Sequence, residues 1–373
     1  GSTGAQGAQG SQGTVGATGA QGDQGNTGNT GAQGATGGVG GGPFNTQEFS
    51  SAFSLTYNSS VYTTNIYNLQ QYNGTTNLVD IAYVQLSNSI YAFGDEVIVM
   101  DAFLTDYLTN IPLPGNTQSK KMEFNPVNNY LYCVSNKIIY AIDPLINTVV
   151  KSMTFSTTSL IIDDVKFNTS NGDMYISFIN SPTVDIYNSS NNYYTTLSGS
   201  TTNFPSGVVS TGKMAFNEFE GDMYIQTFGV SGQVIRVNTN RTIQTSYGIS
   251  GLTGSLFYEP VNESVYAYDT SNLWKIDNGL TVSISGVSVT GFSDIIFNNL
   301  TGQMDLSDSS TAFRGIDLTT NNVEFTTYLG NYGYLALNQY DGSVYMSSKG
   351  SNAIVVINPV DGTSLNINPM TSM

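Results

Sequence analysis

The sequence predicts an all-β fold of seven short four-stranded sheets, preceded by an extended N-terminal segment with a different repeat. Glycine recurs at every third position from Gly1 to Gly40. From about residue 80 onward, an anchor residue recurs with a period near 42 residues. Short runs of Tyr, Phe, Ile and Val, bounded by Asn, Gly and Ser, are typical of strands, and no long amphipathic helix is predicted.

The composition excludes several kinds of chemistry. The 373 residues contain no histidine and one cysteine, Cys133, which excludes Ser-His-Asp triads, His-ligated zinc and intrachain disulfides. Eleven basic and 27 acidic residues give a formal net charge of −16, which argues against nucleic acid or an anionic membrane as a partner. No run approaches the roughly 18 apolar residues of a membrane span.

Residues 1–42 are predicted to form a stalk. Residues 1–39 are thirteen uninterrupted Gly-X-Y triplets, and such spacing is required where three polyproline-II-like chains meet at an axis. The segment resembles the collagen-like regions of bacterial, phage and giant-virus surface proteins, which implies a parallel homotrimer. It contains no proline, and the alternative is a flexible Gly-rich linker that does not trimerise. Because the chain starts in mid-repeat, we expect a processed or truncated form.

Threonines at the third position of the triplets are candidates for O-glycosylation. They are Thr3, Thr18, Thr27, Thr30 and Thr36.

Seven repeats follow in residues 80–373. Each has an anchor and, eight positions later, a second repeated residue: Tyr83/Tyr91, Phe124/Tyr132, Phe167/Tyr175, Phe216/Tyr224, Tyr258/Tyr266, Phe297/Asp305 and Leu337/Tyr345. The anchors are spaced by 41, 43, 49, 42, 39 and 40 residues. A unit of this length with four short strands is one blade of a β-propeller, so a seven-bladed β-propeller is expected. Asn-Gly-Asp, Glu-Gly-Asp and Asp-Gly-Ser turns at residues 171–173, 220–222 and 341–343 fit positions that need positive φ.

Two segments carry a family resemblance. Residues 131–150 and 344–359 resemble the YVTN-type propeller repeat, a relative of the NHL and WD40 propellers, found in bacterial and archaeal surface-layer proteins. The likeness covers about residues 80–373. It implies a propeller architecture and leaves function open, because propellers host enzymes, scaffolds and binders.

Residues 43–79 do not fit an eighth blade. Two strand-like runs, at 53–57 and 61–67, either close the ring against the last blade or form a neck between stalk and head. We favour the neck slightly, because the last repeat is expected to have four strands of its own through Leu365–Ile367.

Small acidic clusters are the first candidate sites. They comprise Asp163 with Asp164, Asp173, Glu220 with Asp222, and Asp305 with Asp308. Carboxylates around a propeller axis can hold Ca²⁺ through oxygen ligands. Turn positions favour Asp for backbone reasons, so we interpret most of these residues as turn residues and expect no resident cofactor.

The longest interval between anchors contains the candidate contact loop, with Tyr193, Tyr194 and Phe204. Exposed aromatic residues in a long loop suit carbohydrate or a neighbouring subunit. The equal alternative is a long outer strand whose tyrosines pack between blades. Cys133 is expected to be a buried, unreactive thiol.

Together these features predict an extracellular, non-enzymatic structural protein on a cell, spore or virion surface. Collagen-like trimerisation would build a fibre or appendage, decorated by propeller heads. The alternative is a stalked adhesin whose head recognises glycan or a host protein. A third hypothesis, an extracellular hydrolase or lyase, requires paired carboxylates at a defined separation.

Overall fold

The structure of the protein is a computed structural model. It describes residues 54–57, 60–68 and most of 78–360, together with Gly1, Gly4, Gly7 and Gly10. The gaps within 78–360 are residues 117, 156–159, 191, 199–206, 230–232, 250–251, 261, 270–271, 278–279, 284–291, 309–311, 319–321, 329–332 and 349–352. The chain divides into two compact units, Gly1–Thr46 and Gln47–Met373.

The second unit is a seven-bladed β-propeller, as the 42-residue period predicts. Six blades are four-stranded antiparallel sheets, and the seventh has five strands. Blade 1 consists of β3 (Asp80–Val84), β4 (Ser89–Phe93), β5 (Val97–Asp101) and β6 (Tyr107–Ile111). Blade 2 consists of β7 (Ser119–Asn125), β8 (Tyr130–Ser135), β9 (Ile138–Asp143) and β10 (Thr148–Thr154). Blade 3 consists of β11 (Ile161–Phe167), β12 (Met174–Ile179), β13 (Val184–Tyr187) and β14 (Tyr193–Leu197).

Blades 4 to 6 repeat this order. Blade 4 consists of β15 (Val208–Asn217), β16 (Asp222–Gly229), β17 (Gln233–Val237) and β18 (Ile243–Gly248). Blade 5 consists of β19 (Ser255–Glu259), β20 (Ser264–Tyr268), β21 (Leu273–Asp277) and β22 (Leu280–Ser283). Blade 6 consists of β23 (Phe292–Asn298), β24 (Gln303–Asp308), β25 (Ala312–Asp317) and β26 (Asn322–Tyr328).

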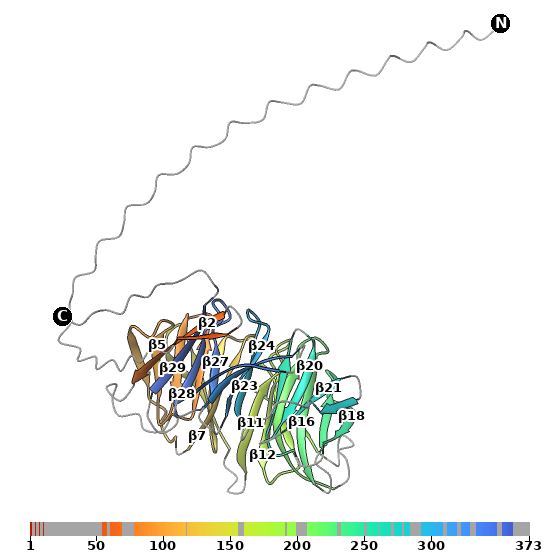
Figure 1. Ribbon diagram of the computed structural model, residues 1–373. Coiled ribbons are helices and arrows are strands. Elements are labelled where there is room, and N and C mark those ends of the chain that lie inside the picture. The colour runs from red at the N-terminus through yellow and green to blue at the C-terminus, as the bar shows by residue number, and fades with distance from the viewer. Residues whose placement is uncertain are drawn as a thin grey trace. The chain divides into compact units, whose positions relative to one another are not determined.

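The seventh blade joins the two ends of the described chain. It contains β27 (Leu335–Leu337), β28 (Val344–Ser348) and β29 (Ala353–Val360), followed by β2 (Ser60–Asn68) and β1 (Ser54–Tyr57). β2 pairs antiparallel with β29 along its whole length, from Val61 opposite Val360 to Asn68 opposite Ala353. Figure 1 shows β2, β29 and β28 side by side. This pairing is that of ring-closing strands, whereas residues 361–373, where a fourth strand was expected, lie outside the described residues.

Seven hydrophobic clusters hold the ring, one at each contact between neighbouring blades. The cluster between blades 7 and 1, for example, packs Ile90 and Met100 against Tyr345 and Ile354. Every blade therefore buries both faces, which explains why apolar residues are spread evenly along the sequence.

Two of the repeated tyrosines also link blades by hydrogen bonds. All six repeated tyrosines lie on the second strand of their blade and are buried. The Tyr91 hydroxyl donates to the Pro144 carbonyl oxygen in blade 2 at 3.1 Å, and the Tyr345 hydroxyl donates to the Ala102 carbonyl oxygen in blade 1. At Tyr91 and Tyr345 the eight-residue offset thus places a buried donor where it reaches the next blade, whereas the Tyr224 hydroxyl donates to Glu220 of its own blade at 2.8 Å.

The inner hairpin turns confirm the prediction that their glycines adopt positive φ. Gly172, Gly221 and Gly342 have φ values of 76°, 75° and 74°. A Cβ at Gly172 would also lie 2.9 Å from the Ser189 Cβ, so this turn excludes a side chain on two grounds.

Candidate functional site

The candidate site is the central channel of the propeller, a cavity of about 910 Å³. Residues from the first strand of every blade line it, because these strands surround the axis. The residues three positions before the seven anchors form what we call the axial ring. Its members, in blade order, are Asp80, Lys121, Asp164, Lys213, Ser255, Asp294 and Tyr334.

Acidic and basic residue types alternate around the first four blades of the axial ring, as Asp80, Lys121, Asp164 and Lys213. Lys121 Nζ lies 2.7 Å from Asp164 Oδ1 and 3.2 Å from Glu123 Oε2. Glu123 also pairs with Lys166, and Lys213 pairs with Asp163 at 3.1 Å. Three channel lysines therefore meet carboxylates of neighbouring strands, whereas Lys120 donates to the Ile162 carbonyl oxygen, and this network spans blades 2, 3 and 4.

The three aspartates of the axial ring make the same bond to the following blade. The carboxylate of Asp164 accepts the backbone N–H of Met214 at 2.8 Å, and that of Asp294 accepts the Leu335 N–H at 2.8 Å. The Asp80 carboxylate accepts the Met122 N–H in the same way. Each aspartate also lies on the inner strand of its own blade, so it links two blades next to the axis.

The two sides of the channel differ in their electrostatics. Burial raises the pKa of Asp80 to about 8 and that of Asp294 to about 6; the charge of Asp294 contributes to the shift of Asp80. Burial alone would raise the pKa of Asp164 too, but Lys121 and Lys213 outweigh it and hold this pKa below its usual range. Burial would likewise lower the pKa of Lys121, yet Asp164 and Glu123 raise it. Ion pairing thus dominates at blades 2 to 4, and desolvation dominates at blades 6 and 1.

One carboxyl occupies the position of the repeated tyrosine. Asp305 of blade 6 is buried on β24, and its Oδ2 accepts the Asn298 side-chain amide at 3.3 Å. Burial raises the pKa of Asp305 to about 7. The same Asn298 amide donates to the Gly342 carbonyl oxygen of blade 7 at 2.9 Å, so Asp305 lies at a contact between blades.

The acidic clusters of the sequence lie beside basic side chains. The ion pairs are Asp163–Lys213, Asp164–Lys121, Asp173–Arg241, Glu220–Arg236, Asp222–Arg236 and Asp308–Arg314. The prediction that most of these acids occupy turns is wrong for five of them: Asp163 and Asp164 lie within β11, Asp222 begins β16, and Asp305 and Asp308 lie within β24. A strand interior tolerates a carboxylate when neighbouring strands supply a cation or an N–H group.

The expectation of no resident cofactor stays a prediction, with calcium at the axis as the alternative. Across the described residues there is no group of three or more Asp, Glu, His or Cys side chains that could hold a metal ion. In the same part of the chain, no helix is long and apolar enough to cross a membrane.

The candidate contact loop is partly described. Tyr193 and Tyr194 lie in β14, the outer strand of blade 3, and Phe204 lies outside the described residues. Tyr193 is 58% exposed, and its ring packs edge-on against Tyr187 of the same blade with centroids 5.6 Å apart. The five O-glycosylation candidates also lie outside the described residues. Cys133 is buried and free, and burial raises its pKa well above the ordinary value, as expected for an unreactive thiol.

The axial ring was not predicted from the sequence, although a signal exists. Counting three positions back from each anchor finds all seven members. No protein-family model and no curated protein matches the chain.

Proposed function

We propose that this chain is an extracellular, non-enzymatic structural protein in which the propeller is a head on a collagen-like, homotrimeric stalk. The observation that carries the proposal is the division of the chain. One compact unit, Gly1–Thr46, contains all thirteen triplets, and the other contains the whole propeller. The channel supports a structural role, since its described ionic groups bond to neighbouring strands and blades.

The glycine spacing supplies a sharp test of the stalk. In the single chain, a Cβ added to Gly7 or Gly10 would meet no atom within 4 Å. Nothing within one chain therefore requires glycine there, whereas a triple-helix axis does. We expect the full chain to sediment at about three times 39.9 kDa. Gly7→Ala with Gly10→Ala should lower the melting temperature of the trimer or leave monomers.

The matched control changes a neighbouring position that points away from a triple-helix axis. Ala8→Ser should leave the trimer unchanged, and near-ultraviolet circular dichroism should show an intact propeller in every variant. A wild-type chain that sediments as a monomer at all concentrations would overturn the proposed stalk. So would a trimer that is indifferent to the glycine substitutions.

The stalked adhesin is a second candidate, favoured by the exposure of Tyr193. An exposed tyrosine ring on an outer strand can stack on a sugar face. If the head binds glycan there, a glycan array probed with the full chain should give signals that Tyr193→Ala abolishes. Tyr107→Ala, at another exposed tyrosine on the outer strand of blade 1, should retain them. Equal loss in both variants, or no signal with the wild type, would count against this candidate.

A further inference from the structure

Large apolar side chains occupy the tips of the inner hairpins. In an antiparallel blade, the turn between the first and second strands and the turn between the third and fourth strands lie on one face, here called the tip face. The residue three positions after the anchor is at the inner tip, where small polar residues are usual. Exposed apolar residues nevertheless stand there in five blades: Leu86, Val127, Phe219, Leu300 and Tyr340.

Strongly exposed apolar residues occupy tip turns of four consecutive blades, apart from Phe219 of blade 4, which is 68% exposed. Five side chains, each between 57% and 70% exposed, lie on the tip turns of blades 6, 7, 1 and 2. We name them the tip arc; it consists of Leu300, Tyr340, Phe103, Leu145 and Ile146. Leu86 and Val127, a little under half exposed, occupy the inner tips of blades 1 and 2. Blade 3 has Ser170 at the equivalent inner tip, so the apolar surface does not continue around the ring.

Hydrogen bonds between blades join the turns that carry the tip arc. Asn298 of blade 6 donates to Gly342, two residues from Tyr340. Tyr345 of blade 7 donates to Ala102, the neighbour of Phe103, and Tyr91 of blade 1 donates to Pro144, the neighbour of Leu145. Consecutive turns are therefore tied together, and the arc is one pre-organised surface.

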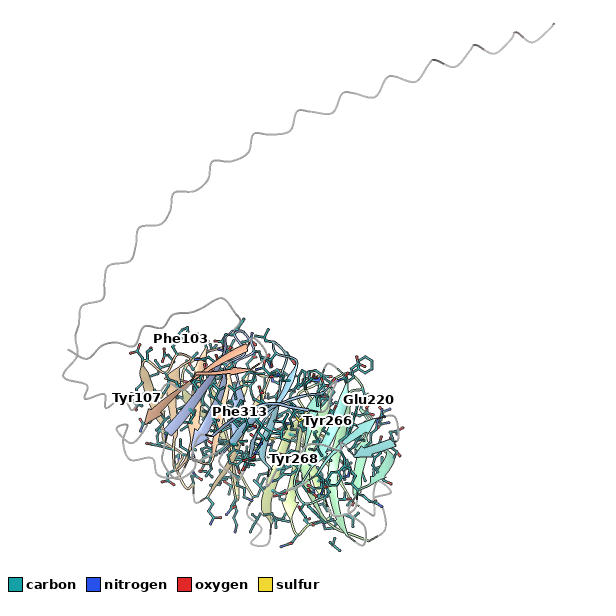
Figure 2. All side chains as sticks on the ribbon, viewed as in Figure 1. Phe103, Tyr107, Glu220, Tyr266, Tyr268 and Phe313 are labelled. Atoms are coloured by element: carbon teal, nitrogen blue, oxygen red, sulfur yellow. The ribbon has the colours of Figure 1, made fainter. Side chains whose placement is uncertain are left out.

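The backbone of the turn at Phe103 is strained, and its conformation keeps the phenyl ring of Phe103 in solvent. Leu104 has a φ of 56°, a left-handed conformation that is rare for a bulky residue. Its side chain is buried in the cluster between blades 7 and 1, while Phe103 is 70% exposed. Such strain is typical of functional positions. Figure 2 shows Phe103 at the opposite end of the head from Glu220, which adjoins Phe219.

The charge on this surface has one sign. Asp106 and Asp341 are exposed beside the arc, on blades 1 and 7. The described tip turns of blades 6, 7, 1 and 2 contain no lysine or arginine. A second copy docked through the same face would bring carboxylates against carboxylates. A partner that carries both apolar and cationic side chains complements the apolar arc and the carboxylates beside it.

A groove next to the arc can receive a protruding side chain. It has a volume of about 730 Å³ and lies between the outer strand of blade 1 and blade 2. Ile146 of the arc belongs to its lining, with Leu108, Ile111, Tyr140 and Val149. A pocket beside a flat apolar surface is the arrangement that anchors a hot-spot residue in protein interfaces.

We propose that the tip arc and this groove form a docking surface for a polypeptide segment in which apolar and cationic side chains alternate. The inference rests on the proposed function only in taking the propeller as an interaction head. It gives that head a specific face and a partner of specific chemistry.

The test uses the full chain and three labelled twelve-residue peptides, (Leu-Lys)6, (Ser-Lys)6 and (Leu-Glu)6, with fluorescence anisotropy at 150 mM salt. We expect (Leu-Lys)6 to bind at least tenfold more tightly than either of the others. Phe103→Ser with Tyr340→Ser should weaken that binding at least tenfold. The matched control, Phe219→Ser with Val209→Ser, removes equally exposed apolar residues from blade 4 and should change the affinity less than twofold.

Three results would overturn the proposal. Equal binding of (Leu-Lys)6 and (Ser-Lys)6 would show general attraction to an acidic chain, and equal effects of the two double variants would show binding elsewhere. Self-association that Phe103→Ser with Tyr340→Ser abolishes, without peptide binding, would assign the surface to a second copy. Ile146→Ser is a milder variant in case the double variant does not fold. Sedimentation of the same samples reports the stalk-dependent trimer separately, so failure of the docking surface and failure of the stalk are distinguishable.

Discussion

Replacing Asp164 by alanine should lower the free energy of unfolding by about 3 to 5 kcal/mol, the usual cost of removing one partner of a buried ion pair. Asp164 is buried, and its carboxylate contacts Lys121 Nζ at 2.7 Å and the Met214 N–H at 2.8 Å. Without it, the largely buried Lys121 keeps Glu123 as its one ion-pair partner among the described residues, and a backbone donor at the contact between blades 3 and 4 loses its acceptor.

The measurement is urea unfolding of the full chain at pH 7, followed by the fluorescence of Trp274, the single tryptophan. Asp163→Ala is the matched control. This neighbouring aspartate pairs with Lys213 at 3.1 Å, but both side chains are more exposed than the Asp164 carboxylate, so a loss of about 1 kcal/mol or less is expected.

A double variant distinguishes the contribution of the ion pair to the free energy of unfolding from the contribution of side-chain packing. Lys121→Met removes the cation while keeping a long side chain, so combining it with Asp164→Ala should cost less than the sum of the two single changes. Additive effects, or equal losses in Asp163→Ala and Asp164→Ala, would contradict the role given to the axial ring.

The propeller could be predicted from the sequence because the same kinds of residue recur in each blade: a large apolar or aromatic anchor and, in six of seven repeats, a tyrosine eight positions later. Packing between blades needs a large apolar side chain at the anchor and a buried hydroxyl eight positions later, as at Phe124 and Tyr132. The axial ring was harder to predict because each blade contributes a different residue. Asp80 and Lys121 become related only when the first strands are placed around one axis.

Two other features depend on contacts that the local sequence does not reveal. β2 finds its partner β29 almost three hundred residues away, and no local pattern distinguishes such a strand from a neck. Phe103 and Leu104 are adjacent apolar residues that both suit a core, yet only Leu104 is buried. The exposed member of such a pair is decided by the turn geometry.

The second large effect is a loss of stability as the pH rises from about 4 to about 8. Asp305, buried where six other blades have an inward tyrosine, has a pKa raised to about 7 by that burial. The folded chain therefore keeps a proton that the unfolded chain loses near pH 4, and each step up in pH favours unfolding until Asp305 has ionised in the folded state. Asp80 and Asp294, with pKa values raised to about 8 and about 6, act in the same direction.

The contribution of Asp164 to stability changes with pH in the opposite direction and over a more acidic range. Its pKa is lowered in the folded state, so its contribution is present above about pH 4 and is lost as the pH falls through the folded pKa. Stability should consequently pass through a maximum on the acid side of neutrality and decline toward pH 8.

Asp305→Asn isolates one of these groups, since the amide keeps the shape of the carboxyl and cannot ionise. At pH 8 the variant should be more stable than the wild type by up to about 4 kcal/mol, which corresponds to a shift of roughly three pKa units at 1.36 kcal/mol per unit. At pH 5 the difference should shrink to about 2 kcal/mol, because only the unfolded chain has ionised there, and it should nearly vanish near pH 3, where Asp305 is protonated in both states. Asp106→Asn, at an exposed tip residue of blade 1, is the control and should leave the slope of stability against pH unchanged. If Asp305→Asn shifted stability equally at pH 5 and pH 8, its effect would come from packing, and ionisation of the blade 6 carboxyl would not be the source of the pH dependence.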